Sequence, residues 1–273
     1  MLEGWGVRII SIANQKGGVA KTTTTINLGA SLASMGKKVL LIDLDPQAHT
    51  TLGLSIEPDT IKKTMLNVME PSRSKDKLKL EEVVVKMSYN EADDLFVAPT
   101  NIDFASAEYK LIDQIGREDF LAASIRECKI PFDYVLIDCP PSLGILTVNA
   151  LKACNEVIIP MQPHFFALRG IEEFIETTEL VRRNLNHSIK ISILVTIADM
   201  RSNLAKEVME EIKQYFRDSL FKTIIRKNIT LVEASSQGVP ALYYSPRSHG
   251  AVDYYKLGQE VMSFEKENVG ARI

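Results

Sequence analysis

Residues 7–23 read VRIISIANQKGGVAKTT. The run before the glycines is short, apolar and rich in isoleucine, which is typical of a strand buried on both faces of a parallel sheet. Two adjacent glycines follow, and a helical pattern then begins near Lys21 and continues to Met35. A strand, a glycine-rich loop and a helix in this order predict an α/β fold in which the loop binds phosphate.

The loop carries the groups that nucleotide phosphates need. Adjacent glycines allow backbone N–H groups to point inward at an anion, and the start of the next helix adds partial positive charge. Lys21 can place its ammonium on the β- and γ-phosphate oxygens, and the Thr22 hydroxyl can reach Mg²⁺. Ala20, where a glycine commonly precedes the lysine, is expected to fit with a negative φ. The expected nucleotide-binding residues of the loop are Lys16, Gly17, Gly18, Val19, Ala20, Lys21, Thr22 and Thr23.

Apolar runs alternate with longer helical patterns along the chain, which predicts a mostly parallel sheet flanked by helices in a single domain spanning residues 1–273. The helices are expected at 22–35, 165–184, 203–216 and 252–264, whereas residues 55–94 are the least regular part and are expected to form short surface helices. The expected strands are Val7–Ala13, Val39–Asp43, Leu95–Pro99, Tyr134–Asp138, Val157–Met161, Ile191–Ala198 and Thr223–Ile225.

Two of these runs end in acidic residues. Asp43 closes one run, with Asp45 two positions later, and Asp138 closes another. Because the carboxyl ends of parallel strands meet at one edge of a sheet, these side chains are expected to gather near the phosphate loop. One carboxylate there suits Mg²⁺, and another can orient the water that attacks a γ-phosphate. For Asp43, a purely structural role in capping the following loop stays open.

The composition excludes several classes of protein. Hydrophobic residues make up 45% of the chain and charged residues 25%, as in globular proteins, and the net charge of −3 gives no bulk attraction to nucleic acid. No segment reaches the roughly 18 apolar residues of a membrane span, and the first residues do not read as a secretory signal, so a cytoplasmic protein is expected. Three cysteines without a CxxC pair and four scattered histidines predict no metal or cluster site within one chain.

The pattern KGGxxK[ST], formed by residues 16–22, is the deviant Walker A signature, and the chain resembles the ParA/MinD superfamily of P-loop ATPases. Later segments resemble the ParA/Soj partition ATPases in particular, so that the resemblance covers nearly the whole chain. One departure is that the family's Pro-Arg-Asn-x-Arg reads RKNIT at residues 226–230. The later segments that carry the resemblance are Val195–Leu204, Phe221–Ala234, Ser236–Pro240 and Tyr244–Ala251.

The resemblance implies ATP and Mg²⁺ as cofactors, and a homodimer with ATP sandwiched between the subunits. In such a dimer Lys16 reaches across the interface to the partner's nucleotide. Asp138 is then the Walker B carboxylate on the Mg²⁺ side, acting through water, Asp45 positions the attacking water, and Asn228 lies at the adenine end. The resemblance thus implies Lys16, Lys21, Asp45 and Asp138 as catalytic residues, and Thr22 and Asp138 as Mg²⁺ ligands, with Asp43 as a further candidate.

Partition ATPases of this type bind double-stranded DNA without sequence preference once ATP has dimerised them, and a ParB-type centromere-binding protein stimulates hydrolysis. The resemblance implies a nucleoid-associated ATPase for chromosome or plasmid partition, with slow intrinsic turnover and no N-terminal helix-turn-helix domain. Between residues 201 and 256, nine Lys and Arg residues stand against six Asp and Glu residues, an excess that two subunits would double. The residues expected to neutralise DNA phosphates are Arg201, Arg226, Lys227 and Arg247, with Lys222 and Lys206 as further candidates.

Two alternatives share this nucleotide site. A MinD-like membrane-associated ATPase needs a C-terminal amphipathic helix, usually basic, whereas residues 258–273 carry three glutamates against one lysine and one arginine. The apolar residues of that segment, Val261, Met262 and Phe264, are expected to pack on the domain instead. An iron–sulfur carrier ATPase needs cysteines that can bridge a dimer, and the spacing of the three cysteines does not match that family well.

Overall fold

The computed structural model describes residues 7–71, 73–164, 167–199, 201 and 203–270. Within these residues seven strands form one sheet in the order β3-β4-β2-β5-β1-β6-β7. Neighbouring strands are parallel except for the β3–β4 pair at one edge. The mostly parallel sheet that the sequence predicts is therefore confirmed. The strands are β1 Arg8–Ile12, β2 Val39–Asp43, β3 Val85–Lys86, β4 Leu95–Ala98, β5 Tyr134–Asp138, β6 Glu156–Met161 and β7 Lys190–Val195.

The central strands bring the polar strand ends to one edge. Asp43 at the end of β2 is in register with Asp138 at the end of β5, and Asp138 is in register with Ile12 at the end of β1. The glycine-rich loop follows β1 and leads into α1, Lys21–Ser34. The phosphate loop and both carboxylates therefore lie at the same edge of the sheet, as parallel pairing requires.

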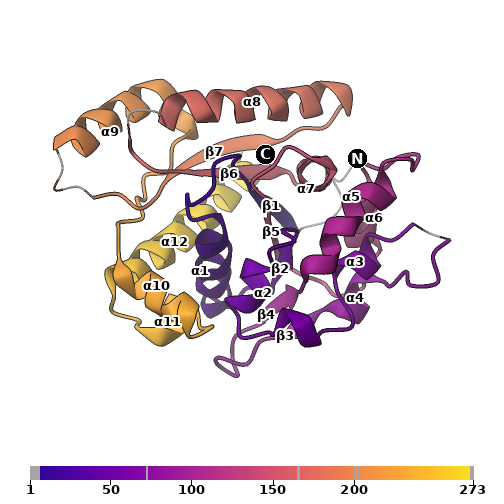
Figure 1. Ribbon diagram of the computed structural model, residues 1–273. Helices are drawn as coiled ribbons and strands as arrows, with labels where there is room; N and C mark the ends of the chain where they lie inside the picture. The colour runs from indigo at the N-terminus through magenta and orange to yellow at the C-terminus, as the bar shows by residue number, and fades with distance from the viewer. Residues whose placement is uncertain (1–6, 72, 165–166, 200, 202, 271–273) are drawn as a thin grey trace.

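Helices cover both faces of the sheet (Figure 1), because the central strands such as β2 and β5 present apolar side chains to both sides. On one face α1 packs against α12, where the hydroxyls of Thr24 and Tyr254 are 3.0 Å apart. The other face is covered by α3 to α9. The α-helices are α1, α2 His49–Leu52, α3 Met65–Val68, α4 Leu80–Val83, α5 Ser106–Leu111, α6 Phe120–Glu127, α7 Ile145–Ala153, α8 Ala167–Asn184, α9 Asn203–Phe216, α10 Ile229–Ser236, α11 Ala241–Tyr244 and α12 His249–Gly270, and the 3-10 helices are η1 Pro58–Thr60, η2 Ile102–Ala105 and η3 Arg217–Ser219.

The segment Thr223–Ile225 is not a strand, and that prediction was wrong. Phe221 N donates to Ile193 O and Ile225 N donates to Val195 O. The two donors are four residues apart, whereas the two acceptors on β7 are only two residues apart, so the segment bulges away from β7 and cannot form a regular ladder. Two N–H groups in between are taken by Glu260 of α12, whose carboxylate accepts from Lys222 N at 2.7 Å and from Thr223 N at 2.9 Å. A side chain from a distant helix thus replaces the strand ladder, and an apolar run cannot reveal this.

Residues 55–94 contain the short helices η1, α3 and α4, as expected, and also β3, which the sequence did not predict. Helices α6, α7 and α10 were not predicted either. At the C-terminal end of the chain, Val261 is fully buried, and Met262 and Phe264 pack against the same apolar cluster, which confirms that this segment packs on the domain. Among the described residues, no helix is long and apolar enough to cross a membrane.

We expect Glu260→Ala to lower the free energy of unfolding by about 2 kcal/mol, because two backbone N–H groups lose a charged acceptor. Glu260→Gln keeps one acceptor oxygen and should lose less. Glu233 is exposed on α10, and Glu233→Ala should stay within roughly 0.5 kcal/mol of the parent protein. Urea unfolding followed by circular dichroism measures all three, and equal losses for Glu260→Ala and Glu233→Ala would contradict the role of Glu260 in holding the segment.

Candidate nucleotide site

A cleft of about 690 Å³ opens at the carboxyl edge of the sheet. One wall is the phosphate loop and the start of α1, a second is α2 with the loop before it, and a third is α10. The sequence-predicted residues that line it are Gly17, Gly18, Ala20, Lys21, Thr22, Thr23 and Asp45, and the further lining residues are Ile26, Gln47, His49, Leu52, Gly53, Pro141, Ile197, Val232, Ser235 and Ser236.

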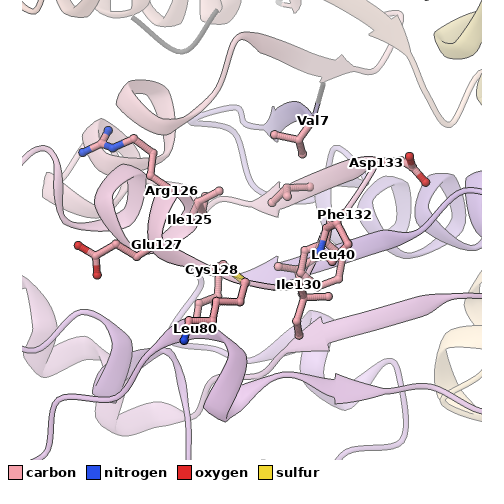
Figure 2. A pocket seen from close by; sticks show the side chains of 13 residues that line it. Val7, Leu40, Leu80, Ile125, Arg126, Glu127, Cys128, Ile130, Phe132 and Asp133 are labelled. Carbon is pink, nitrogen blue, oxygen red and sulfur yellow. The ribbon is translucent and has the colours of Figure 1, made fainter. Parts of the chain in front are cut away.

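A second cavity, of about 650 Å³, lies at the opposite end of the strands (Figure 2). Figure 2 shows apolar side chains such as Ile125, Ile130 and Phe132 around it, with Cys128 among them. Burial raises the pKa of the Cys128 thiol, which keeps it in its unreactive protonated form. This cavity brings together none of the residues that the sequence predicts to be functional, so the candidate site is the cleft at the carboxyl edge.

Lys21 is the first residue of α1 and is almost completely buried. Its ammonium lies 3.4 Å from the carbonyl oxygen of Lys16, so the side chain folds back over the loop that precedes it. Burial lowers the pKa of Lys21, while the carboxylates of Asp138 and Asp45 act in the opposite direction. A lysine held at the base of a loop in this way can meet an anion that sits between the loop and the carboxylates.

Ala20 differs from the expectation. Its φ is +67°, in the left-handed region, whereas a negative value is expected from the sequence, and that prediction was wrong. A Cβ disfavours this region, which is why glycine is the usual residue there. The loop enters α1 through this residue, and the N–H of Thr24 already bonds to the carbonyl oxygen of Ala20 at 2.9 Å. The turn is therefore imposed on the alanine by the loop and the helix on either side.

Asp138 is the carboxylate on which the loop and α2 converge. Its Oδ2 accepts hydrogen bonds from the hydroxyls of Thr22 at 2.8 Å and of Thr50 at 2.7 Å. Its Oδ1 is buried and has no hydrogen-bond partner among the described residues. Burial raises the pKa of Asp138 to about 6 in spite of the two threonine bonds. An oxygen donor set made of Thr22 and Asp138 fits Mg²⁺, which would offset the cost of burying this charge.

Asp43 and Asp45 take different positions. Asp43 is fully buried and does not line the cleft, because its oxygens accept hydrogen bonds from Thr51, through N–H and hydroxyl, and from the N–H of Asp45. Burial and the neighbouring Asp138 carboxylate raise the pKa of Asp43 to about 8. Asp45 lines the cleft and accepts a bond from Gln47 N at 3.0 Å. Of the two, only Asp45 faces the space that a nucleotide would fill.

Lys16 is exposed at the rim of the loop. Its backbone N–H donates to Asn14 Oδ1 at 2.9 Å, and its ammonium contacts the Nε2 atom of His164. Burial, and then the nearby Lys16 charge, lower the pKa of His164, so that its imidazole can accept from the lysine. The side chain of Lys16 thus contacts His164 and does not line the cleft.

The far end of the cleft is apolar. Leu52 and Val232 line it, with 51% and 64% of their surface exposed, together with Ile197. Asn228 does not line the cleft; it caps α10 by accepting from Thr230 N at 2.8 Å. It thereby holds the helix whose side chains form this end of the cleft. A flat apolar ring fits between exposed aliphatic side chains of this kind.

The basic residues expected to contact DNA are exposed or partly exposed, and two of them are paired. The guanidinium of Arg201 donates to both oxygens of Asp199, at 2.9 and 2.7 Å. The guanidinium of Arg226 donates to both oxygens of Asp253, at 2.9 and 2.6 Å. A bridge between Ala198 and Arg226 brings the two pairs into neighbouring segments. Lys227 and Arg247 are exposed, and the side chain of Lys206 lies outside the described residues.

Sequence reasoning missed several residues that hold the site together. Thr50 binds Asp138, Gln162 donates from Nε2 to Gly18 O at 2.7 Å, and Thr196 donates to Val19 O at 3.0 Å. Gln162 and Thr196 each follow the last residue of a parallel strand, β6 and β7. A polar residue at the carboxyl end of a buried strand is the signal that could have found both.

Comparison with known proteins agrees with this geometry. A family model described as an AAA domain matches residues 7–191. The sporulation initiation inhibitor protein Soj of Bacillus subtilis is 43% identical over 255 residues, which cover 93% of this chain and 98% of that protein. The chromosome partitioning protein ParA of Myxococcus xanthus is 41% identical, covering 95% and 90%. This chain belongs to the ParA/Soj family of ATPases.

The fold is also shared with solved structures of nucleotide-bound proteins. A Mycobacterium smegmatis protein described as cobyrinic acid a,c-diamide synthase, with bound ATP analog and magnesium, is 31% identical with a TM-score of 0.80, covering 96% of this chain and 97% of that one. Among the described residues of this ParA/Soj-family chain, no group of three or more His, Cys, Asp or Glu side chains could hold a metal ion by itself. All three cysteines are buried, which does not favour a cluster bridged between subunits.

We expect Ala20→Gly to raise the free energy of unfolding by about 1 kcal/mol, because glycine adopts the left-handed conformation without the Cβ penalty. The matched change Ala30→Gly, at a buried position inside α1, should lower it by about 1 kcal/mol or more. Chemical denaturation in the absence of nucleotide compares the two. A loss of stability for Ala20→Gly comparable to that of Ala30→Gly would show that the loop does not impose the left-handed turn.

Proposed function

We propose that this protein is a DNA-partition ATPase that binds ATP and Mg²⁺ in the cleft at the carboxyl edge of the sheet. The observation that carries the proposal is the Asp138 carboxylate, buried at the end of β5, which binds Thr22 of the phosphate loop and Thr50 of α2 while its other oxygen has no partner among the described residues. Family membership at 43% identity to Soj supports the same assignment.

Each group of the cleft has a place in this reaction. The loop backbone and Lys21 bind the β- and γ-phosphates, and the apolar end between Leu52 and Val232 takes the base. Thr22 and Asp138, the latter through water, would hold Mg²⁺, which supplies positive charge next to the phosphate oxygens. Asp45 orients a water molecule whose oxygen attacks the γ-phosphorus, and the bond to the β–γ bridging oxygen breaks to give ADP and phosphate. Catalysis is then by positioning and charge neutralisation without a covalent nucleophile, and the slow intrinsic turnover that we propose rests on membership of the ParA/Soj family.

The proposed active form is a homodimer that closes on two ATP molecules. Lys16 is exposed and does not line the cleft of its own subunit, so we take its ammonium to be available to the γ-phosphate bound by the partner subunit. Its contact with His164 is between exposed groups and is easily exchanged for a phosphate. Binding of ATP would thus be required before the two subunits associate.

The dimer is proposed to bind double-stranded DNA without sequence preference, through Arg201, Arg226, Lys227 and Arg247. These residues act on backbone phosphates and read no bases, so binding depends strongly on salt. Two copies of the surface on one dimer would bind more tightly than one copy on a monomer, which lets nucleotide state control DNA binding. Hydrolysis, stimulated by a ParB-type partner at a centromere site, would release the DNA, and the protein would be associated with the nucleoid.

We expect Asp45→Ala to retain ATP binding and lose at least about 100-fold in hydrolysis rate, because the attacking water loses its orienting group. Phosphate release under saturating ATP measures turnover, and a fluorescent ATP analogue measures binding. Glu57 is exposed outside the cleft, and Glu57→Ala should turn over normally. Normal hydrolysis by Asp45→Ala would remove the carboxylate from the reaction.

We expect the protein to bind a random-sequence duplex with ATP but not with ADP or without nucleotide, and we expect Lys16→Ala to lose this binding while it still binds ATP. Fluorescence anisotropy at two salt concentrations measures the affinity, with Lys63→Ala, at an exposed position outside the cleft, as the control. Absence of DNA binding by the parent protein in every nucleotide state would refute the partition role. Equal DNA binding by Lys16→Ala and Lys63→Ala would refute the proposal that Lys16 binds the nucleotide of the partner subunit.

A further inference from the structure

A basic hollow of about 400 Å³ lies between the segment 222–226 and α12, outside the nucleotide cleft. Three cationic side chains and one carboxylate line it, so the hollow carries an excess of positive charge. It includes part of the segment that was expected to form the strand Thr223–Ile225. It also adds Lys256, which was not predicted from the sequence, to the proposed DNA surface. The residues that line it are Lys222, Thr223, Ile224, Arg226, Asp253 and Lys256.

Asp253 fixes the guanidinium of Arg226 at the wall of this hollow. Only 4% of Asp253 is exposed, and its oxygens accept from Nε at 2.9 Å, from Nη2 at 2.6 Å and from the backbone N–H of Arg226 at 3.1 Å. A buried carboxylate without its partner would be strongly unfavourable, so the pair stays formed. The guanidinium has five N–H donors and the carboxylate occupies two of them. With 41% of the side chain exposed, the remaining donors face solvent at a fixed position.

The two lysines are the charged groups that stay available. Lys222 and Lys256 are exposed, and within the described part of the chain neither ammonium forms an ion pair or a hydrogen bond. Another acid of α12, Glu260, uses both carboxylate oxygens on the backbone N–H groups of Lys222 and Thr223. Asp253 and Lys256 are three residues apart on α12, so they lie on the same face of the helix. The hollow thus combines one fixed and two adjustable cations around one space.

We propose that this hollow binds a phosphate group of the DNA backbone, with Lys222, Lys256 and the outer N–H groups of Arg226 as its ligands. The proposal rests on the proposed DNA-binding function and extends it. A DNA backbone, and not free phosphate, is the proposed ligand because further exposed cations stand close by in the chain: Lys227 directly follows Arg226, and Arg201 lies three residues after Ala198, which bridges to Arg226. Several cations on neighbouring segments can neutralise more than one phosphate of a DNA backbone, whereas free phosphate needs only one such group.

The test compares two exposed lysines. We expect Lys256→Gln to weaken ATP-dependent binding of a random duplex at least about fivefold, and to make the dependence of log K on log salt shallower by about 0.9 for each phosphate that is no longer neutralised. Lys129→Gln is the control, because it makes the same change of charge beside the cavity at the other end of the strands. Fluorescence anisotropy is measured from low to high salt, with thermal melting to confirm folding.

A second variant tests the fixed guanidinium. The double change Arg226→Gln with Asp253→Asn removes the pair without altering net charge, so weaker DNA binding by this variant supports Arg226 as a ligand. A shallower salt dependence for Lys256→Gln but not for Lys129→Gln supports the hollow as a binding site for a DNA phosphate. Equal affinities for Lys256→Gln and Lys129→Gln, with normal binding by the parent protein, would overturn this inference and leave the partition role intact. A parent protein that binds no DNA with ATP would overturn both.

Discussion

The burial of Asp138 is the constraint on which the rest of the site depends. Its carboxylate stands at the end of the central strand β5, in register with Asp43 on one side and Ile12 on the other. Removing this charge from water is unfavourable, and two threonine hydroxyls compensate only part of the cost. One hydroxyl comes from the phosphate loop and the other from α2. The two hydrogen bonds that satisfy the carboxylate therefore also tie these two walls of the cleft to the end of β5. A nucleotide and its cation would thus bind between walls that Asp138 Oδ2 already joins.

The parts of this site that could be predicted from the sequence are the residues whose positions are set by strand pairing alone. The strands β1, β2 and β5 are apolar on both faces, and parallel pairing then forces the glycine loop, Asp45 and Asp138 to one edge without any knowledge of side-chain contacts. The common position of the residues predicted to bind phosphate was therefore accessible from the sequence. Periodicity likewise located α1 and α9, because both are long enough for a helical repeat to be recognised.

The parts that could not be predicted depend on partners far away in the chain. The conformation of Ala20 is set by the loop and helix around it, and its residue type argues for the opposite sign of φ. The segment Thr223–Ile225 reads as a strand, yet Glu260, 37 residues beyond Thr223, takes its first N–H group. Thr50 gave no signal because its role exists only once α2 lies over the end of β5. In each case tertiary contacts decide between conformations that are close in local free energy.

The same dependence on partners changes how the surface charge is to be understood. A count of basic residues treats Arg201 and Arg226 alike, and both form ion pairs with aspartates. The Arg201 side chain is 91% exposed and that of Asp199 is 37% exposed, so water screens the pair and a phosphate can replace the carboxylate at little cost. The side chain of Asp253 is only 5% exposed, so Arg226 cannot leave it without stranding a buried charge. In the proposed DNA complex, Arg201 can therefore exchange its partner for a phosphate, whereas Arg226 can act only as a fixed group that keeps its partner.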